Sequence, residues 1–243
     1  MEKFSIRYFY RCFVFALGAF SASLTLELIV EEFEVAHMSQ LTLIINLLVL
    51  FVPCKYWYSV RIFQHYAYLP FQFRLSQWNN TISDKQKSIT LDFLKEKSVG
   101  NHLLIFGGHH CGKTSLGIGI ANELAIKFKK IIYTSAIKLS CFIVNNKETS
   151  PLDLLWSWRE ADLLIVDDIN PGKPILDEIF TPSQFLSYIN SKKEYAVKNR
   201  ELIAQKNMIW ILGNQNTQLE KRWCSMLKNI GVTSDKIKII KLC

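Results

Sequence analysis

The stretch GGHHCGKTS, residues 107–115, decides the fold of this chain. It matches the spacing G-x-x-x-x-G-K-[ST], whose specified positions are filled by Gly107, Gly112, Lys113 and Thr114. Glycines allow backbone N–H groups to turn inward around phosphate oxygens, and the N-terminus of a following helix adds the positive end of its dipole. The stretch therefore predicts a loop that cradles the phosphates of a nucleotide.

The segments on either side of the loop have the periodicity that such a loop needs. Residues 102–106 (HLLIF) form a short, continuous apolar run, which is typical of a buried parallel strand. Residues 116–130 (LGIGIANELAIKFKK) carry apolar side chains at helical spacing. The motif thus lies in the strand–loop–helix context that its chemistry requires.

Two side chains of the loop have specific roles. We expect Lys113 to reach the β- and γ-phosphates of ATP and the Thr114 hydroxyl to ligate Mg²⁺. The middle positions act mainly through their backbone, so two histidines and a cysteine are compatible with binding. The whole loop is predicted to contact the nucleotide: Gly107, Gly108, His109, His110, Cys111, Gly112, Lys113, Thr114 and Ser115. A metal site on the adjacent residues 109–111 is disfavoured, because neighbouring loop side chains point apart.

A second apolar run ends in two carboxylates. Residues 161–170 (ADLLIVDDIN) predict a buried strand whose last residues include Asp167 and Asp168. We expect Asp167 to hold the Mg²⁺ through water and Asp168 to polarise the water that attacks the γ-phosphate. The alternative for Asp168 is that it only caps a turn.

Two further segments carry candidate catalytic residues. Residues 207–214 (NMIWILGN) predict a third strand, and its last residue, Asn214, would orient the attacking water or sense the γ-phosphate, or else cap a turn. Residues 219–231 predict a helix on which Arg222 is the best candidate for an arginine supplied to a neighbouring subunit. The adjacent Lys221 leaves that choice open, and a solvated helix arginine is the alternative.

The order of the apolar runs defines the fold class. Further strands are predicted at the runs KIIYTSA (130–136) and IKIIKL (237–242), with helices between the strands. Alternating strands and helices predict a parallel sheet with helices on both faces. The sequence therefore predicts an α/β fold of the P-loop NTPase class.

These motifs resemble those of AAA+ ATPases of the helicase-loader and transposition-helper type, the IstB/DnaC-like group. The resemblance lies in GGHHCGKTSLGIGIANEL, IIYTSAIKL, READLLIVDDI and the strand ending in ILGN, and covers roughly residues 98–243. It implies an ATP-dependent ring or filament, often on DNA, with a partner protein. It also implies that the glycines, Lys113 and Thr114 bind ATP–Mg²⁺, that Asp167 and Asp168 form the metal and hydrolysis pair, and that Asn214 is the first sensor.

The first seventy residues have a different composition. Residues 13–30 and 38–54 are two mostly apolar stretches, each close to the lower length limit for a membrane-spanning helix. Aromatic residues 56–58 follow the second stretch, as in an interfacial belt. We predict a transmembrane helical hairpin over about residues 13–30 and 38–58. The alternatives are a cleaved signal peptide, two buried helices of a soluble domain, or a re-entrant wedge.

The charges beside these stretches predict their orientation. Basic residues precede the first stretch and follow the second, whereas the acidic EEFE (31–34) lies between them. Because positive residues favour the cytoplasmic side, we expect both termini and the ATPase domain to be cytoplasmic. The predicted domains are the hairpin (1–70), a linker ending in a short helix (71–100) and the P-loop ATPase domain (101–243).

Charge and cysteine content restrict the partners. Five basic and five acidic residues cancel within 1–70, so the net charge of +8 belongs to residues 71–243. Such a surface suits an anionic partner such as DNA or an anionic lipid, although it also fits an ordinary lysine-rich surface. The six cysteines are scattered without a CxxC pair, which disfavours a disulfide framework or a metal site.

Three functions remain open from the sequence. The chain could be a membrane-anchored ATPase that works as a homo-oligomer on DNA or a DNA–protein complex. It could instead be a secretion, conjugation or packaging motor, which a polar residue such as Gln215 beside Asn214 keeps open. The third possibility is an assembly switch that binds ATP with little turnover, since Asp168 stands where a glutamate is common.

Overall fold

The computed structural model describes residues 56–77, 82–95, 99–145, 156–169, 180–190, 194–213 and 217–242. The predicted hairpin lies outside these residues except for 56–58, which begin the described part of a helix that continues to residue 66. Asn214 also lies outside them. Among the described residues, no helix has the length and apolar character needed to cross a bilayer.

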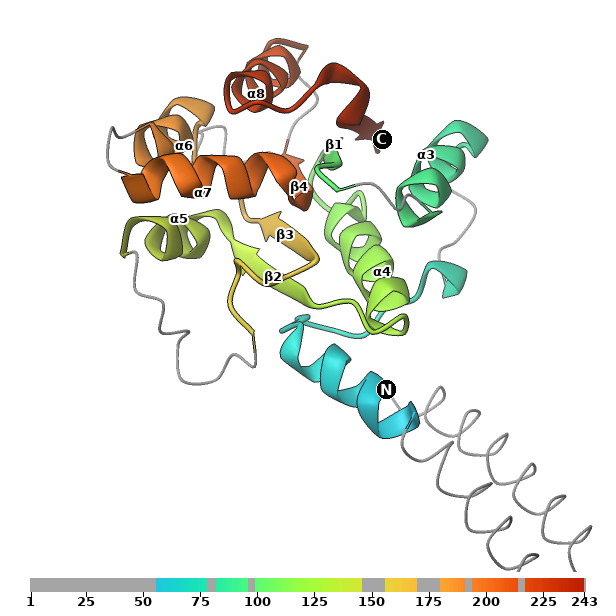
Figure 1. Ribbon diagram of the computed structural model, residues 1–243. Coiled ribbons are helices and arrows are strands. Elements are labelled where there is room, and N and C mark those ends of the chain that lie inside the picture. Colours follow the sequence, from blue (N-terminus) through green and yellow to red (C-terminus); the bar gives the residue numbers. More distant parts are fainter. Residues whose placement is uncertain are drawn as a thin grey trace, which may run out of the picture. The chain divides into compact units, whose positions relative to one another are not determined.

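Contacts within the chain group it into two units, Met1–Ile62 and Phe63–Cys243. In the described part of the first unit, the Arg61 guanidinium lies 5.4 Å from the ring centre of Trp57. The second unit contains the sheet and all the labelled helices (Figure 1). The predicted boundaries at residues 70 and 100 stay predictions.

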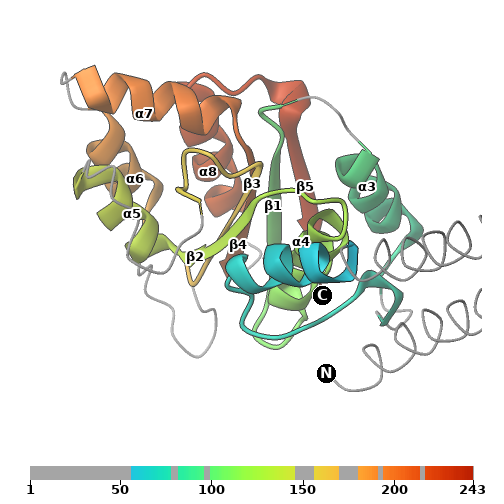
Figure 2. The ribbon, with the colours of Figure 1, turned by 60° about the horizontal axis from the view of Figure 1, so that its bottom comes forward.

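A five-stranded parallel sheet forms the centre of the second unit (Figure 2). Its strands lie in the order β2-β3-β4-β1-β5. Their bounds are β1 His102–Gly107, β2 Ile131–Ser135, β3 Leu163–Asp167, β4 Asn207–Gly213 and β5 Ile237–Lys241. All four strand pairs are parallel, which confirms the predicted sheet.

The strand before the phosphate loop lies inside the sheet. β1 pairs with β4 from His102↔Met208 to Gly107↔Gly213, and with β5 from His102↔Ile237 to Phe106↔Lys241. On the other side of β4, β3 pairs with the edge strand β2, with Asp167 opposite Ser135. Since the strands are parallel, the phosphate loop and the two aspartates follow carboxyl ends on the same edge of the sheet.

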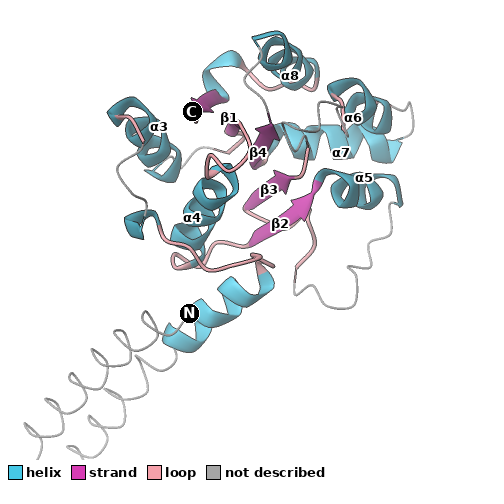
Figure 3. Ribbon diagram, turned by 180° about the vertical axis from the view of Figure 1, so that it is seen from behind, coloured by secondary structure: helices cyan, strands magenta, loops and turns pink. Residues whose placement is uncertain are grey.

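Helices cover both faces of the sheet, as predicted (Figures 1 and 3). α3 (Asp84–Lys95) and α4 (Lys113–Ala125) lie on one face, with Leu103, Ile105 and Ile165 in the core beneath them. The other face carries α5, α6, α7 and α8 over Leu104 and Trp210. Their bounds are α5 Ala136–Asn145, α6 Pro182–Ile189, α7 Glu194–Gln205 and α8 Thr217–Asn229. Short 3₁₀ turns, η1 and η2, span Leu75–Gln77 and Ser234–Lys236.

Alternation along each strand explains the two cores. In β1, Leu103 and Ile105 belong to the α4 side, whereas Leu104 and Phe106 belong to the opposite side. Successive side chains of a strand point to opposite faces, so a fully buried strand needs an apolar residue at nearly every position. This is why the strands appear in the sequence as continuous apolar runs.

The segment 63–75 lies against α4 and is called the strap below. Gln64 Nε2 donates to Asn122 Oδ1 at 2.8 Å, and Asn122 Nδ2 donates to the Phe73 carbonyl at 2.9 Å. A Cβ added at Gly119 would lie 2.8 Å from Leu75 Cδ2, so a larger residue there would require the Leu75 side chain to shift. The strap thus packs along the helix that begins at the phosphate loop.

Candidate functional site

The loop from β1 to α4 has the backbone geometry of a phosphate cradle. Gly107 ends β1 so close to the end of β5 that an added Cβ would lie 2.9 Å from the Leu242 carbonyl oxygen. Gly112 has φ 77°, a left-handed conformation that glycine adopts without steric cost. His110, with φ 60°, takes the same conformation although it has a side chain. Glycine is therefore required at residue 107 by the close approach of the end of β5, and at residue 112 it suits the left-handed backbone.

The helix that follows leaves its first N–H groups available to an anion. Gly112 is the N-cap of α4 and no side chain caps that turn, while the first helical bond runs from the Leu116 N–H to the Gly112 carbonyl at 2.9 Å. The N–H groups of Lys113, Thr114 and Ser115 thus belong to the unsatisfied first turn. With the helix dipole, these donors make a site for phosphate oxygens.

Lys113 folds back over the loop. Its Nζ donates to the Gly108 carbonyl, which places the ammonium inside the cradle. Burial lowers the pKa of Lys113, and the nearby Cys111 and Asp167 partly oppose this by favouring the charged form. Phosphate oxygens are stronger acceptors for an ammonium than a neutral carbonyl is.

Asp167, at the end of β3, lies directly beside the first turn of α4. Its Oδ2 accepts a hydrogen bond from Thr114 Oγ1 at 2.8 Å, and its Oδ1 accepts from the Asp168 N–H at 2.8 Å. The residue is only 6% exposed, so both oxygens are held in a fixed direction. The predicted metal ligands Thr114 and Asp167, 53 residues apart in sequence, are brought together.

This pair fits the chemistry of magnesium. A hydroxyl and a carboxylate are oxygen donors of the kind that Mg²⁺ prefers, and Mg²⁺ is usually held by one or two protein groups together with water and substrate phosphates. The pair lies beside the phosphate cradle, where such a shared ion would be needed. The residues present therefore fit both a nucleotide and its magnesium.

Tyr133 is a member of the site that the motifs did not reveal. Its hydroxyl donates to Asp167 Oδ2 at 2.6 Å, from the edge strand β2. Burial and the hydrogen bond to Asp167 raise the pKa of the phenol, followed by the charges of Asp167 and Asp168. A polar aromatic residue inside the run IIYTS is a local signal, but its meeting with Asp167 follows only from the register of β2 and β3.

Asp168 differs from its neighbour in both backbone and exposure. It has φ 55°, and its side chain is exposed. Partial desolvation, and then the charge of Asp167, raise the pKa of its carboxyl. Strained backbone conformations gather at functional sites, and a raised pKa suits a group that accepts a proton.

The remaining predicted residues have different positions. The rings of His109 and His110 are 3.9 Å apart at 77°, and Cys111 packs against the core on the α4 side. Among the residues that the structure describes, no group of three metal-ligating side chains gathers. Arg222 lies exposed on α8, a helix whose buried side is formed by Leu219, Trp223, Met226 and Leu227.

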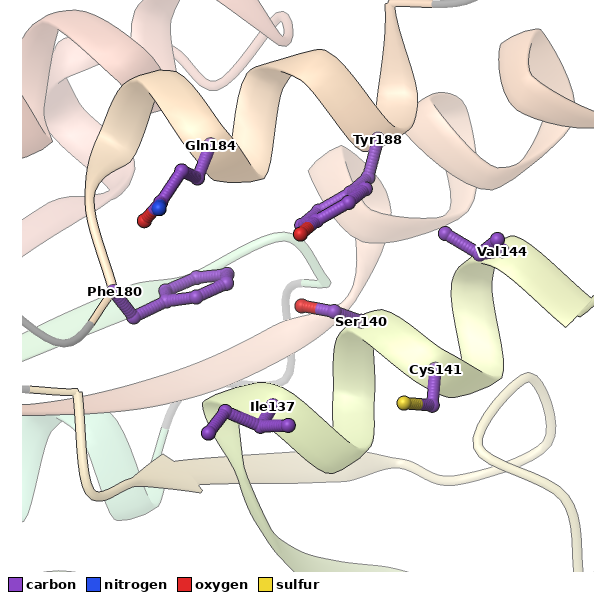
Figure 4. Close-up of a pocket in the computed structure, with 7 residues that line it drawn as sticks. All are labelled: Ile137, Ser140, Cys141, Val144, Phe180, Gln184 and Tyr188. Atoms are coloured by element: carbon purple, nitrogen blue, oxygen red, sulfur yellow. The ribbon is translucent and has the colours of Figure 1, made fainter.

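A separate groove lies between α5 and α6 (Figure 4). It has a volume of about 320 Å³. The side chains of Ser140, Phe180 and Tyr188 converge in it (Figure 4). None of the predicted site residues lines this groove, so it is distinct from the phosphate cradle.

Comparison with known proteins adds the following findings. No protein-family model matches the chain. A crystal structure of the DnaC helicase loader is similar, with 14% identity and a TM-score of 0.45 over 74% of this chain and 99% of that one. A crystal structure of DnaI has 17% identity and a TM-score of 0.44 over 70% and 88%. AMPPCP-bound DnaA from Aquifex aeolicus has 17% identity and a TM-score of 0.44 over 72% and 51%. At these identities and scores the likeness carries no inference about activity, which has to rest on the site.

Proposed function

We propose that this chain is a P-loop ATPase that binds ATP with Mg²⁺ and hydrolyses it. The observation that carries the proposal is the contact between Thr114 and Asp167, 2.8 Å across, at the mouth of a glycine-bounded loop. If the match to the motif were accidental, the fold would not be expected to place a buried carboxylate from another strand within hydrogen-bond distance of the motif's threonine. Mg²⁺, when bound, would neutralise charge on the phosphates.

The residues of the chain would divide the work as follows. The N–H groups of residues 113–115 and the Lys113 ammonium bind and orient the phosphates, which is the main requirement of phosphoryl transfer. Thr114 and Asp167 hold the metal. Asp168, whose raised pKa favours proton uptake, activates the attacking water, and Asn214 completes the site as a sensor.

We further propose that the chain belongs among AAA+-like ATPases of the helicase-loader and transposition-helper kind. The support is the set of four motifs, together with the hydrogen bonds that Thr114 and Tyr133, from two of them, donate to Asp167 of a third. In such an assembly the chain works as a homo-oligomer that remodels or moves a DNA or protein partner. The lysine clusters at 127–130 and 192–200 and the lysines after residue 235 supply candidate phosphate contacts.

Membrane attachment is a separate part of the proposal. The apolar stretches at 13–30 and 38–58 would form a hairpin with both termini in the cytoplasm, so the ATPase domain would act close to the bilayer. A secretion, conjugation or packaging motor is the second candidate function, and this hairpin is the feature that favours it. An ATP-binding switch with little turnover is the third, because Asp168 replaces a longer acid.

One experiment tests ATP binding and membrane attachment together. The full chain and the variant Lys113→Ala are expressed, and the cells are separated into soluble and carbonate-washed membrane fractions. Each protein is then purified, and ATP binding and phosphate release are measured with Mg²⁺. We expect both proteins in the membrane fraction and only the wild type to bind and hydrolyse ATP.

The outcomes separate the candidates. Binding without phosphate release, with or without DNA, would favour the switch over the enzyme. A wild type that binds no ATP would contradict the central proposal, and recovery of both proteins in the soluble fraction would contradict the hairpin.

A further inference from the structure

Tyr133 lies beside Asp167 and has none of the roles proposed above for the phosphate and metal ligands. It lies in the edge strand β2, half-buried on the same face of the sheet as α4, and its hydroxyl reaches across to Asp167 on the neighbouring strand. The distance from Tyr133 Oη to Asp167 Oδ2 is 2.6 Å, shorter than that from Thr114 Oγ1 to the same oxygen. A neutral phenol donating to a carboxylate makes a strong, charge-assisted hydrogen bond.

The register of the sheet explains why this residue meets Asp167. Ser135 is the residue opposite Asp167, and Tyr133 precedes it by two positions, so both side chains leave β2 on the α4 side. From there the phenol spans to the end of β3, whereas the Ser135 hydroxyl accepts a hydrogen bond from the Lys138 N–H, 3.3 Å away. The contact therefore follows from the strand pairing.

The backbone of the same residue is fixed from the other side. The Tyr133 N–H donates to the Ala67 carbonyl at 3.0 Å, so the strap supports β2 along its free edge. The strap thus holds the backbone of Tyr133, and the side chain of Tyr133 in turn holds the Asp167 carboxylate. The backbone bond fixes where the side chain leaves β2, and the bond to Asp167 fixes where the hydroxyl ends.

The two donors to Asp167 Oδ2 have different roles in the site. Thr114 is itself a predicted metal ligand, and its hydroxyl proton needs an acceptor while its oxygen faces the ion. Tyr133 lies on β2 and not on α4, and it is not a predicted metal ligand. With the Asp168 N–H on Oδ1, its hydroxyl fixes the rotation of the carboxylate at both oxygens.

We propose that Tyr133 is a positioning residue for the magnesium site: it holds Asp167 in the orientation that lets Asp167 and Thr114 serve one ion. This inference rests on the proposed function. Groups that orient a metal ligand by hydrogen bonding change metal affinity by about 10- to 100-fold when they are lost. The effect should appear only in the Mg²⁺-dependent part of ATP binding, because the hydrogen bonds of Tyr133 run to Asp167 and to the Ala67 carbonyl.

The test uses the full chain and the variant Tyr133→Phe, which removes the hydroxyl and keeps the ring. ATP affinity is measured in EDTA and over a series of MgCl₂ concentrations, and Mn²⁺ binding to the ATP complex is followed by electron paramagnetic resonance. We expect ATP affinity in EDTA to be unchanged and the metal affinity of the ATP complex to fall about tenfold or more. Tyr66→Phe is the matched control, since Tyr66 packs against Trp156, 6.0 Å between ring centres.

A second comparison keeps the inference testable if the variant is less stable. In an Asp167→Asn background, Tyr133→Phe should cause no further loss of metal affinity, because the carboxylate on which Tyr133 acts is already gone. Unchanged metal affinity in Tyr133→Phe, with or without a lower melting temperature, would overturn the positioning role. A wild type that binds no ATP in either buffer contradicts the proposed function itself, and with it this role.

Discussion

His102, the first residue of β1, is a buried titratable group outside the site. Its Nδ1 accepts a hydrogen bond from Trp210 Nε1 at 3.1 Å, and the two rings are nearly parallel, 14° apart. Burial lowers the pKa of His102 to about 4; the carbonyls of Ala204 and Ile203 oppose this, and the charge of Lys236 adds to it. The folded protein therefore holds this histidine neutral.

This pKa predicts how stability depends on pH. The folded value lies below the unfolded one of about 6.5, so the unfolded chain binds the extra proton between these values. The contribution is complete above about pH 6.5 and is lost as the pH falls towards 4, up to about 3 kcal/mol. In denaturant unfolding from pH 7.5 to 4.5, the wild type should lose more stability than His102→Asn, whose side-chain oxygen can still accept from Trp210. If the free energy of unfolding fell by the same amount with pH in both proteins, His102 would not titrate in this way.

Among the site residues, those of the motif could be predicted and those set by strand pairing could not. The positions of Gly107, Gly112, Lys113 and Thr114 relative to one another follow from local spacing, and the structure gives them the expected strand–loop–helix context. The role of Tyr133 could not be predicted, because its contact with Asp167 depends on the register between two strands. No local pattern encodes that register.

At the scale of elements, α4 is held on the side away from the sheet by the strap. Asn122 is 2% exposed and makes two hydrogen bonds there, one with Gln64 and one with the Phe73 carbonyl. The next residue, Glu123, makes only a partly exposed ion pair with Arg74, 3.3 Å between Arg74 Nε and Glu123 Oε1. The two neighbours offer a direct comparison of buried and exposed contacts.

We expect Asn122→Ala to destabilise the fold by about 2 kcal/mol or more, because it removes the buried hydrogen bonds that Asn122 makes with the Gln64 amide and the Phe73 carbonyl. Glu123→Ala should cost less than about 1 kcal/mol, as partly solvated ion pairs do. Thermal unfolding followed by circular dichroism measures both. Equal melting temperatures for the two variants would show that the strap does not hold α4 through Asn122.

The positions of the strands and helices along the chain could largely be predicted from the sequence, but which strands lie side by side could not. Apolar runs located four strands, the alternating pattern of residues 236–242 located β5, and alternation of strands with helices predicted the parallel sheet. The insertion of β4 between β1 and β3 has no local signature, because any buried strand can lie beside any other. The strap crosses the predicted boundary at residue 70, and its sequence FQHYAYLPFQFRL has no regular period, because its role exists only in its contacts with α4.

At the scale of the whole molecule, the proposed oligomer makes a prediction about Arg222. If this exposed residue completes the site of a neighbouring protomer, Arg222→Ala should bind ATP normally and lose phosphate release, whereas Lys113→Ala should lose binding. A mixture of the two inactive variants should regain activity, because some interfaces would pair an intact loop with an intact arginine. Phosphate release in the mixture, compared with each variant alone, is the measurement.

Lys221→Ala is the control for this mixing experiment, since Lys221 is also exposed and precedes Arg222 on α8. It should retain activity by itself. Failure of the mixture to exceed the separate variants, although the variants assemble together, would argue against an arginine shared between protomers.

The order of the strands also governs when this protein can become functional during its synthesis. β1 leaves the ribosome early, but both of its partners, β4 at residues 207–213 and β5 at 237–241, are made roughly a hundred residues later. Until then its apolar side chains have no sheet to join and are exposed to aggregation or to chaperones. By contrast, β2 and β3 are synthesised within a short interval and can pair first. The phosphate loop, although encoded in the first half of the chain, is therefore among the last parts of the nascent protein to gain its final shape.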